Sequence, residues 1–403
     1  WNRKRSKLMN QSASRRTFLK TAGAVAAAMA LPARGQETSA APAPKIVAGP
    51  YLQNVSPEAA TVMWITDKPC VSRVDYGPTR ELGNRVQNSH HGLVDAHDLI
   101  HRMHLTGLTP GHPCYYRVSS REITLFEPYK VEFGDQVEDA VRQFTPPLPG
   151  AGRVDFAVFN DIHETAETWA RVHELAGQAP CDFLVFNGDL LNHAQDHGQV
   201  TRRFLAPATG PLEGARPFVF VRGNHEARGV YARHLLDYFD SPDGGYYHAF
   251  TWGPVHFLVV DTGEDKLDES NEYFGLANFK PYLEKEAAWV AEQVKSDAFR
   301  QAAFRVVLCH IPLRPSRPND YRLPIIEALN GTGVDLSISA HMHKPAYHEP
   351  EPGRDFPIVV GGAPKPAEAT VIRVEAEPTE MRLQMTLADG TLLESRHYSA
   401  RRA

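Results

Sequence analysis

The segment Phe218-Val219-Phe220-Val221-Arg222-Gly223-Asn224-His225-Glu226 decides the fold class. It opens with a short apolar run that is typical of a β-strand. An amide side chain and an imidazole follow where that strand would end. In layered α/β proteins, ligand-binding side chains gather at the carboxyl ends of the strands. The segment therefore predicts an α/β domain with a site at this edge of the sheet.

Four other segments repeat this arrangement of an apolar run followed by polar side chains that can bind a metal. Chance pairs of histidine are common in a chain with 19 of them, so the order and context of the segments carry the prediction. Carboxylate and amide oxygens combined with imidazole nitrogens suit Mn, Zn or Fe, and the set is large enough for two divalent ions. The segments are Asp161-Ile162-His163, Gly188-Asp189, His310 and His341-Met342-His343.

The chain beyond residue 150 alternates strand patterns with helix patterns, which predicts a layered α/β domain over residues 150–403. Helices are expected over 165–176 and 281–294. The tail, residues 370–398, alternates apolar and polar residues, and Asp389-Gly390 predicts a hairpin turn there. We expect these tail strands to complete the sheet. The other strands are expected over 154–159, 183–186, 218–221, 256–260, 305–308, 334–338 and 358–360.

Residues 45–147 show strand patterns alone, such as 61–65 and 72–76, with turn residues at intervals of about ten. This spacing predicts an all-β sandwich. The turn Leu108-Thr109-Pro110-Gly111 before a Tyr-Tyr strand resembles a fibronectin type III domain. Pro146-Pro147-Leu148-Pro149-Gly150 marks the boundary with the α/β domain.

The N-terminal residues resemble an export signal rather than part of a fold. Arg15-Arg16 precede a short apolar stretch, Thr21 to Leu31, as in a twin-arginine signal. The alternative is a single membrane anchor, but the stretch is shorter than the about 20 residues that a span needs. We expect a signal peptide over 1–36, a linker over 37–44, and a periplasmic or secreted protein without a membrane span in its mature form.

Composition excludes several classes of protein. The 403 residues suit two domains, and a hydrophobic fraction of 42% provides an ample core. The net charge of −5 offers no basic surplus for nucleic acid or an anionic membrane surface. Four cysteines are present, of which Cys70 and Cys114 could pair in an oxidising compartment while Cys181 and Cys309 fit buried strands.

The five segments together resemble the motif series of the calcineurin-like metallophosphoesterase superfamily, Asp-x-His, Gly-Asp, Gly-Asn-His-Asp/Glu, His and Gly-His-x-His. With a sandwich in front, the layout is similar to that of purple acid phosphatases, and Gly49-Pro50-Tyr51-Leu52-Gln53 resembles the start of their sandwich. The resemblance implies a binuclear metal centre bridged by Asp189. His225 would contact the phosphate and act as general acid or electrostatic stabiliser. The implied ligands are Asp161, His163, Asp189 and His343 for one ion, and Asp189, Asn224, His310 and His341 for the other.

The chain departs from the purple acid phosphatase pattern at two places. Asn192 stands where those enzymes have the tyrosine that binds ferric iron and gives their colour. His163, which they usually lack, is expected to take its place, so we predict a colourless site. Ala340 stands where the superfamily usually has glycine, which could tighten the loop beneath His341.

Further side chains are candidates for the substrate site. Asn192, His193 and Arg228, together with Asn224 and His225, are predicted to bind substrate. A solvated loop is the favoured alternative for His193 and Arg228, as it is for His197 and His248. Arg314 and Arg317 could bind an anion or lie on the surface, and the polar stretch Glu264 to Phe279 could be a lid or a surface excursion.

The sequence thus favours an exported metal-dependent phosphoesterase that hydrolyses small-molecule phosphomonoesters. Hydrolysis of phosphodiesters, such as nucleotides or lipid head groups, would use the same ligands. A hypothesis of another class is a non-catalytic envelope protein, in which the sandwich binds a partner or polysaccharide and the metal domain only stabilises.

Overall fold

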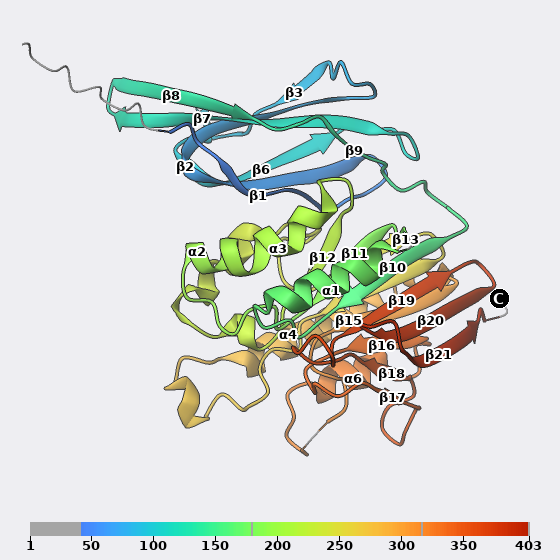
Figure 1. The fold of residues 1–403 in the computed structure, drawn as a ribbon. Coiled ribbons are helices and arrows are strands. Elements are labelled where there is room, and N and C mark those ends of the chain that lie inside the picture. The colour runs from blue at the N-terminus through green and yellow to red at the C-terminus, as the bar shows by residue number, and fades with distance from the viewer. Residues whose placement is uncertain (1–41, 179, 316, 402–403) are drawn as a thin grey trace, which may run out of the picture. The chain divides into compact units, whose positions relative to one another are not determined.

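Two six-stranded sheets form the centre of the C-terminal part of the chain (Figure 1). The computed structural model describes residues 42–178, 180–315 and 317–401, so the predicted signal peptide lies outside the described residues. The first sheet has the order β12 (Phe218–Val221), β11 (Phe183–Asn187), β10 (Val154–Phe159), β19 (Thr370–Ala376), β20 (Glu380–Leu387) and β21 (Leu392–Ser399). The second has the order β13 (His248–Trp252), β14 (Val255–Val260), β15 (Phe304–Cys309), β16 (Leu336–Ser339), β18 (Ile358–Val360) and β17 (Ala346–His348).

The two sheets pack against each other through alternate side chains of their strands. In β10, Val154, Phe156 and Val158 belong to the core between the sheets, while Phe159 faces the opposite way. Phe156 meets Phe257 of β14 edge to face, with ring centroids 5.1 Å apart. Strands buried on both faces have continuous apolar sequences. For this reason the apolar runs predicted as strands in this part are all confirmed.

Helices cover the outer faces of both sheets, which makes four layers (Figure 1). α1 (Ala166–Gly177) packs Trp169 on Phe186 of the first sheet, with centroids 5.4 Å apart. α4 (Phe279–Gln293), α5 (Asp297–Gln301) and α6 (Leu323–Leu329) share a core with the second sheet. The two predicted helices are confirmed to within about two residues at each end. Short helices that connect these elements are α2 (His197–Gln199), η1 (Val200–Leu205), α3 (Ala206–Thr209), η2 (Gly210–Leu212), η3 (His225–Ala227), η4 (Val230–Tyr238) and η5 (Asn271–Tyr273).

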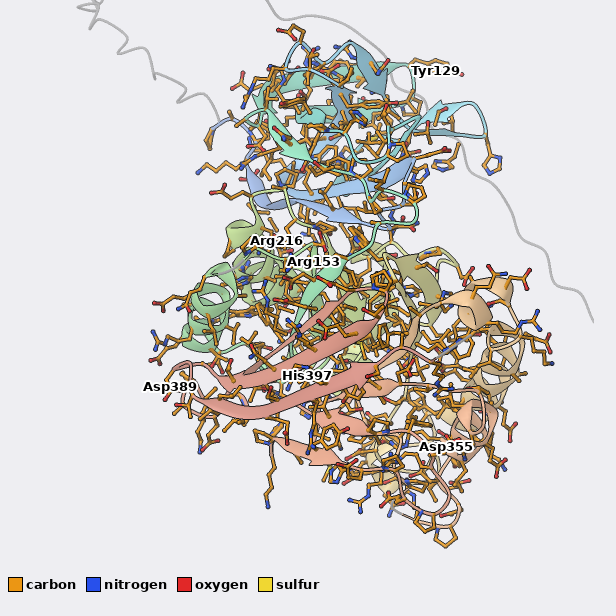
Figure 2. The ribbon with its side chains drawn as sticks, turned by 90° about the vertical axis from the view of Figure 1, so that its right-hand side faces the viewer. Tyr129, Arg153, Arg216, Asp355, Asp389 and His397 are labelled. Atoms are coloured by element: carbon orange, nitrogen blue, oxygen red, sulfur yellow. The ribbon has the colours of Figure 1, made fainter. Side chains whose placement is uncertain are left out.

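The C-terminal strands extend the first sheet, as predicted. β19 pairs antiparallel with β10, and β20 and β21 form a hairpin at the sheet's edge. Asp389 stands at the turn of that hairpin, where its Oδ1 accepts a hydrogen bond from Thr391 N at 2.9 Å (Figure 2).

Seven antiparallel strands near the N-terminus form a separate sheet around its own core. The segments 61–65 and 72–76, predicted as two strands, are one strand, β2. Its first part pairs with β1 and β6, and its second part, from Cys70, pairs with β7 and β3 apart from one remaining pair with β6. A change of partners thus replaces the expected turn. The strands are β1 (Ile46–Gln53), β2 (Ala59–Gly77), β3 (Asn84–Val86), β6 (Asp98–Thr106), β7 (Cys114–Glu127), β8 (Lys130–Glu138) and β9 (Arg142–Phe144), beside a two-stranded pair, β4 (Ser89–His90) and β5 (Leu93–Val94).

Two cysteines and a tryptophan of this sheet are buried. Cys70 and Cys114 are both buried and are free thiols, so the disulfide considered from the sequence does not form. Trp64 is fully buried and donates a hydrogen bond from Nε1 to Ser120 Oγ at 2.9 Å. In contrast, Tyr129 at the turn between β7 and β8 is fully exposed (Figure 2).

The N-terminal sheet is joined to the α/β layers by apolar and polar contacts, and residues 43–403 form one compact unit. Tyr51 of β1 is fully buried in the core on the outer side of the first sheet, and its hydroxyl donates to Tyr238 O at 2.8 Å. Thr61 Oγ1 donates to Asp240 Oδ2 at 2.6 Å. These contacts hold the N-terminal sheet against the segment that follows β12.

Candidate metal centre

The five sequence segments meet at one edge of the two central sheets. β10, β11 and β12 are parallel, so the loops after them leave the first sheet at the same edge. β15 and β16 are likewise parallel in the second sheet. The structure brings together all seven predicted ligands in these loops, because parallel strands present their carboxyl ends on one side.

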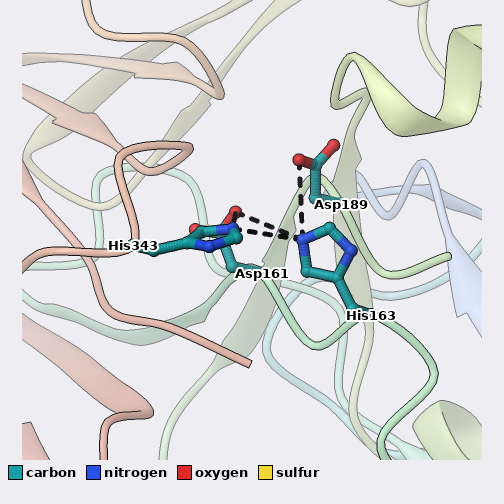
Figure 3. Close-up of side chains that lie close together, drawn as sticks. All are labelled: Asp161, His163, Asp189 and His343. Carbon is teal, nitrogen blue, oxygen red and sulfur yellow. Dashed lines mark hydrogen bonds and ion pairs between the residues drawn. The ribbon is translucent and has the colours of Figure 1, made fainter. Parts of the chain in front are cut away.

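Four side chains form an outer cluster, which we define as Asp161, His163, Asp189 and His343 (Figure 3). His163 Nε2 lies 3.2 Å from His343 Nε2 and 3.8 Å from Asp189 Oδ2. His343 Nε2 lies 3.3 Å from Asp161 Oδ1. The four donor atoms therefore point toward one small space.

A second, inner cluster consists of Asp189, His310, His341 and Asn224, so that Asp189 belongs to both clusters. His310 Nε2 lies 3.1 Å from Asp189 Oδ2, and His341 Nδ1 lies 2.9 Å from Asn224 Oδ1. His310 Nδ1 donates to Asn187 O at 2.8 Å, which directs Nε2 into the cluster. A carboxylate shared in this way can bridge two ions.

The donor spacing fits coordinated cations. Neighbouring donors on one ion lie about 3.0–3.4 Å apart when the metal–ligand bonds are about 2.1 Å long. The separations of 3.1, 3.2 and 3.3 Å given above lie in this range. Moreover, His310 Nε2 is fully buried without a hydrogen bond of good geometry. The chemistry of the donors and their spacing both fit two divalent ions.

The loops that carry the ligands have an uncommon backbone. Asp161, His163, Asp189, His341 and His343 all have positive φ, between 47° and 70°. This left-handed conformation costs an L-residue about 1–2 kcal/mol. Strain of this kind persists where the surrounding structure imposes it, and it clusters at functional sites. Here the strain is concentrated in the ligands themselves.

Two glycines of the motifs are required by close approach to these ligands. A Cβ added to Gly188 would lie 2.3 Å from His310 Nδ1, and one added to Gly223 would lie 2.3 Å from Asp189 Oδ1. Ala340, by contrast, has an ordinary φ, is fully buried and donates its N–H to His310 O at 2.8 Å. The backbone conformation therefore allows alanine at position 340, and it is the next residue, His341, that has the left-handed conformation.

The charges of the inner cluster create a strong preference for positive charge at its centre. Burial by itself would raise the pKa of Asp189, but His310 and His225 outweigh it and lower that pKa. Burial would likewise lower the pKa of His310, but Asp189 and Asp161 reverse the effect and raise it to about 10. The negative charge of the two carboxylates can be balanced either by a proton on His310 or by a metal cation. Metal binding would therefore release that proton.

Glu226 supports the centre from beneath, a role that the sequence motif did not reveal. It is fully buried, and its two carboxylate oxygens accept four backbone hydrogen bonds. The donors are Asp189 N at 2.8 Å, Leu190 N at 2.7 Å, Leu191 N at 3.0 Å and Gly223 N at 2.9 Å. Burial and the nearby Asp189 raise the pKa of Glu226 to about 7. Glu226 thus ties the Asp189 loop to the Asn224 loop.

His225 stands at the mouth of the centre. Its Nδ1 donates to Asn192 O at 2.7 Å, and its backbone N–H donates to Asp189 Oδ1 at 2.9 Å. Nε2 accepts a hydrogen bond from Arg228 Nη1 at 3.1 Å, since a guanidinium can only donate. Asn192 and Arg228 thus contact the two ring nitrogens of His225.

Arg228 is not the solvated loop residue that the sequence favoured. Glu264 receives two hydrogen bonds from it, from Nε to Oε1 and from Nη2 to Oε2, both at 2.9 Å. Asp265 accepts a third at 3.2 Å. This network links His225 to the start of the 264–279 stretch, which the sequence suggested as a lid.

The remaining candidate residues have different surroundings. Asn192 and His193 are exposed, and it is the backbone carbonyl of Asn192 that contacts His225. The prediction of a solvated loop position was wrong for His248, which is buried. It was also wrong for His197, which is half-buried and hydrogen-bonded to the Tyr238 hydroxyl at 2.7 Å. Arg314 is paired with Glu351 at 2.9 Å, and Arg317 donates to Asp265 O at 3.1 Å.

The sequence model of the family described as calcineurin-like phosphoesterase matches residues 154–345, from the start of β10 to just beyond His343. Residues 154–345 are a calcineurin-like phosphoesterase domain. The match spans all seven predicted ligands and indicates a hydrolase of phosphoesters. The sequence model of the twin-arginine translocation signal matches residues 12–32, which indicates export by that route. Among the described helices, none is long and apolar enough to cross a membrane.

Two solved structures are similar to this chain over most of its length. A purple acid phosphatase, PPD1 from yellow lupin (Lupinus luteus) seeds, matches with a TM-score of 0.66 and 15% identity over 89% of this chain and 74% of that one. PhoD matches with a TM-score of 0.57 and 12% identity over 87% of this chain and 89% of that one. At these identities the likeness concerns the fold, and it confirms the predicted resemblance to purple acid phosphatases. The comparison with curated proteins found no match.

Proposed function

We propose that this chain is an exported phosphoesterase that binds two divalent metal ions, Mn, Zn or Fe, and hydrolyses phosphomonoesters of small molecules. The observation that carries the proposal is the position of Asp189, whose carboxylate is shared by the outer and inner clusters. Two ions at these positions would supply Lewis acidity and an activated water nucleophile. The proposed ligands are Asp161, His163, Asp189 and His343 for the outer ion, and Asp189, Asn224, His310 and His341 for the inner one.

His225 would contact the phosphoryl group and assist the leaving oxygen. Asn192 O holds its Nδ1, so Nε2 is the nitrogen available to the substrate. In this structure Nε2 accepts a hydrogen bond from Arg228. While that bond is present, His225 would stabilise the phosphoryl group electrostatically, together with the positive charge of the neighbouring guanidinium. Proton donation by His225 to the leaving oxygen would require that Arg228 release Nε2 and that Nε2 then take up a proton from solvent. Arg228 would then bind a phosphoryl oxygen through Nη1, and Asn192, His193 and Asn224 would be further substrate-binding residues.

We further propose that the site is colourless. Asn192 offers no phenolate, and His163 supplies a nitrogen in the outer cluster 3.8 Å from the bridging carboxylate. The N-terminal sheet would be a fibronectin type III-like domain over 45–147, followed by the phosphoesterase domain over 150–403. Export through the twin-arginine route would place the mature protein in the periplasm or outside the cell.

Phosphodiester hydrolysis is the second candidate. A cavity of about 710 Å³ adjoins His341, which leaves room for an additional organic substituent on the phosphate. A non-catalytic envelope protein is less well supported, since such a protein has no need of His225 or of a shared carboxylate.

The first experiment is metal add-back. Protein stripped of metal is supplied singly with Mn, Zn or Fe and assayed on 4-nitrophenyl phosphate and bis(4-nitrophenyl) phosphate. Metal-restored turnover of the monoester is the expected result, and dominant turnover of the diester would favour the second candidate. Tight metal binding without turnover of either ester would contradict the proposed function.

A further inference from the structure

We infer that the cavity beside His341 receives the organic group of the substrate ester, and that Met342 determines its specificity. The inference rests on the proposed function. It names the class of substrate as phosphate esters of uncharged alcohols that have an apolar body, such as an aromatic ring.

The location of the cavity connects it with the reacting phosphate. His341, a ligand of the inner cluster, lines the cavity together with Met342, Ile311 and Pro312. A cavity of similar size, about 760 Å³, lies near the 264–279 stretch and is lined by aromatic side chains such as Trp289, but none of the predicted ligands lines it. A group bonded to a phosphate at the metal centre therefore reaches the first cavity directly.

The exposure of Met342 points to contact with a ligand. Its side chain is 61% exposed although it stands between His341 and His343, two predicted ligands. The backbone around it is fixed, since Met342 N donates to Ala340 O at 2.8 Å and both histidines have positive φ. The loop thus holds an apolar thioether at the edge of the centre, where protein atoms do not cover it. A flexible, polarisable side chain in such a place suits contact with an apolar group, and especially with an aromatic ring.

The charges around the cavity argue against a second anionic group on the substrate. Two basic side chains, Arg314 and Arg322, and two acidic ones, Asp265 and Glu351, line it. Arg314 is already held by Glu351, from Nε to Oε1 at 2.9 Å and from Nη2 to Oε2 at 3.2 Å. Arg322 donates to Asp320 at 2.8 and 2.6 Å. Because these charges are balanced, the cavity favours an uncharged group over a sugar phosphate or a polyphosphate chain.

Two esters of different size test the inference in the full-length, metal-loaded protein. Phosphate release is measured from 2-naphthyl phosphate and from ethyl phosphate, for the wild type, Met342→Ala and Met342→Leu. For each ester, kcat/KM of the variant is divided by kcat/KM of the wild type, because this ratio cancels the difference in intrinsic reactivity between the two esters. We expect Met342→Ala to lower kcat/KM for the naphthyl ester about five- to tenfold and for ethyl phosphate less than twofold, because apolar contacts in a pocket discriminate by roughly these factors. Met342→Leu should retain most of the activity on the naphthyl ester.

A binding measurement and a matched control complete the test. The calorimetric Kd of the non-hydrolysable 2-naphthylmethylphosphonate should rise in Met342→Ala by the same factor as kcat/KM falls. Leu276→Ala removes another exposed apolar side chain, 75% exposed, from the aromatic-lined cavity and should change neither ester. Equal losses on both esters, or no loss on either, would overturn the inference and leave the proposed function standing. If the wild type releases phosphate from neither ester, the proposed function fails and the inference falls with it.

Discussion

The inner and outer clusters of the centre share Asp189 but differ in burial. The side chain of His310, in the inner cluster, is fully buried, whereas that of His343, in the outer cluster, is 43% exposed. His310 directly follows β15 and is fixed by Asn187 O, while His343 lies in the loop two residues beyond His341. A buried, preoriented donor loses little freedom when it binds an ion. The inner position should therefore hold its ion more tightly, and the outer ion should exchange first.

Replacement of the shared carboxylate should weaken metal binding at both clusters, and so remove the difference in how tightly they hold their ions. Asp189→Asn takes away the bridging charge, so we expect metal content to fall to one ion or fewer and kcat/KM to fall by about 1,000-fold or more. Metal analysis after dialysis, together with phosphate release, measures both. Asp240→Asn, at the contact with the N-terminal sheet, is the matched control and should keep both ions. Retention of two ions in Asp189→Asn would refute a shared ligand.

Removal of one histidine from each cluster sharpens the comparison. We expect His310→Ala to lower kcat/KM by about 100-fold and His343→Ala by about tenfold at saturating metal, since even residues that only orient ligands contribute 10- to 100-fold. The metal concentration that half-restores activity should rise more for His310→Ala. A larger loss in His343→Ala would reverse the proposed order of the two sites.

Glu226 tests whether the two clusters depend on a common support. Glu226→Gln replaces an acceptor of two N–H groups with a donor, and each buried polar group left without a partner costs about 1–3 kcal/mol. We expect lower stability and a 10- to 100-fold loss of activity, of the size seen when residues that support metal ligands are replaced. Glu286→Gln is the control, because Glu286 is equally buried but accepts a backbone bond from Asp261, away from the ligands. Equal effects of the two substitutions on metal content would show that Glu226 has no special role.

The sequence predicted the ligands because they are local features that follow apolar runs. Residues such as Asp161 and His341 could be recognised by their position after a strand, and parallel pairing then brought them together. Glu226 was visible in its motif, yet its four bonds come from backbone groups up to 37 residues away, which no local pattern encodes. The pairing of Arg228 with Glu264 was not predicted for the same reason, since Glu264 lies 36 residues further along.

The long strand β2 shows a different limit of prediction. Its middle residues, Lys68 and Pro69, have the composition of a turn, so the sequence suggested two strands. In the structure tertiary pairing overrides that local preference, because β1 and β6 pair with the first part of one continuous strand while β7 and β3 pair with its second part.

The smallest predicted effect concerns a buried histidine outside both clusters. It separates the effect of burial on the pKa of a histidine from the effect of neighbouring charges. His101 of the N-terminal sheet is 4% exposed, and burial lowers its pKa from 6.5 to about 3. His310 is buried too, but its carboxylate neighbours raise its pKa instead. Between these two pKa values of His101 the unfolded chain binds more protons than the folded one, so stability falls as the pH drops below 6.5. One such histidine contributes about 2 kcal/mol of destabilisation between pH 7.5 and pH 5.

His101→Asn should therefore reduce the loss of unfolding free energy on acidification by about 2 kcal/mol relative to the wild type. Urea unfolding at pH 7.5 and pH 5 measures this difference of differences, in which the titration of the other histidines cancels. Asparagine keeps a partner for Thr66, whose hydroxyl lies 2.9 Å from His101 Nε2, so the substitution removes the titrating group with the least change in bonding. Metal content and kcat/KM at pH 7.5 should be unchanged, because His101 belongs to neither cluster. An unaltered pH dependence would mean that this imidazole is protonated in the folded protein, and that burial alone does not distinguish it from His310.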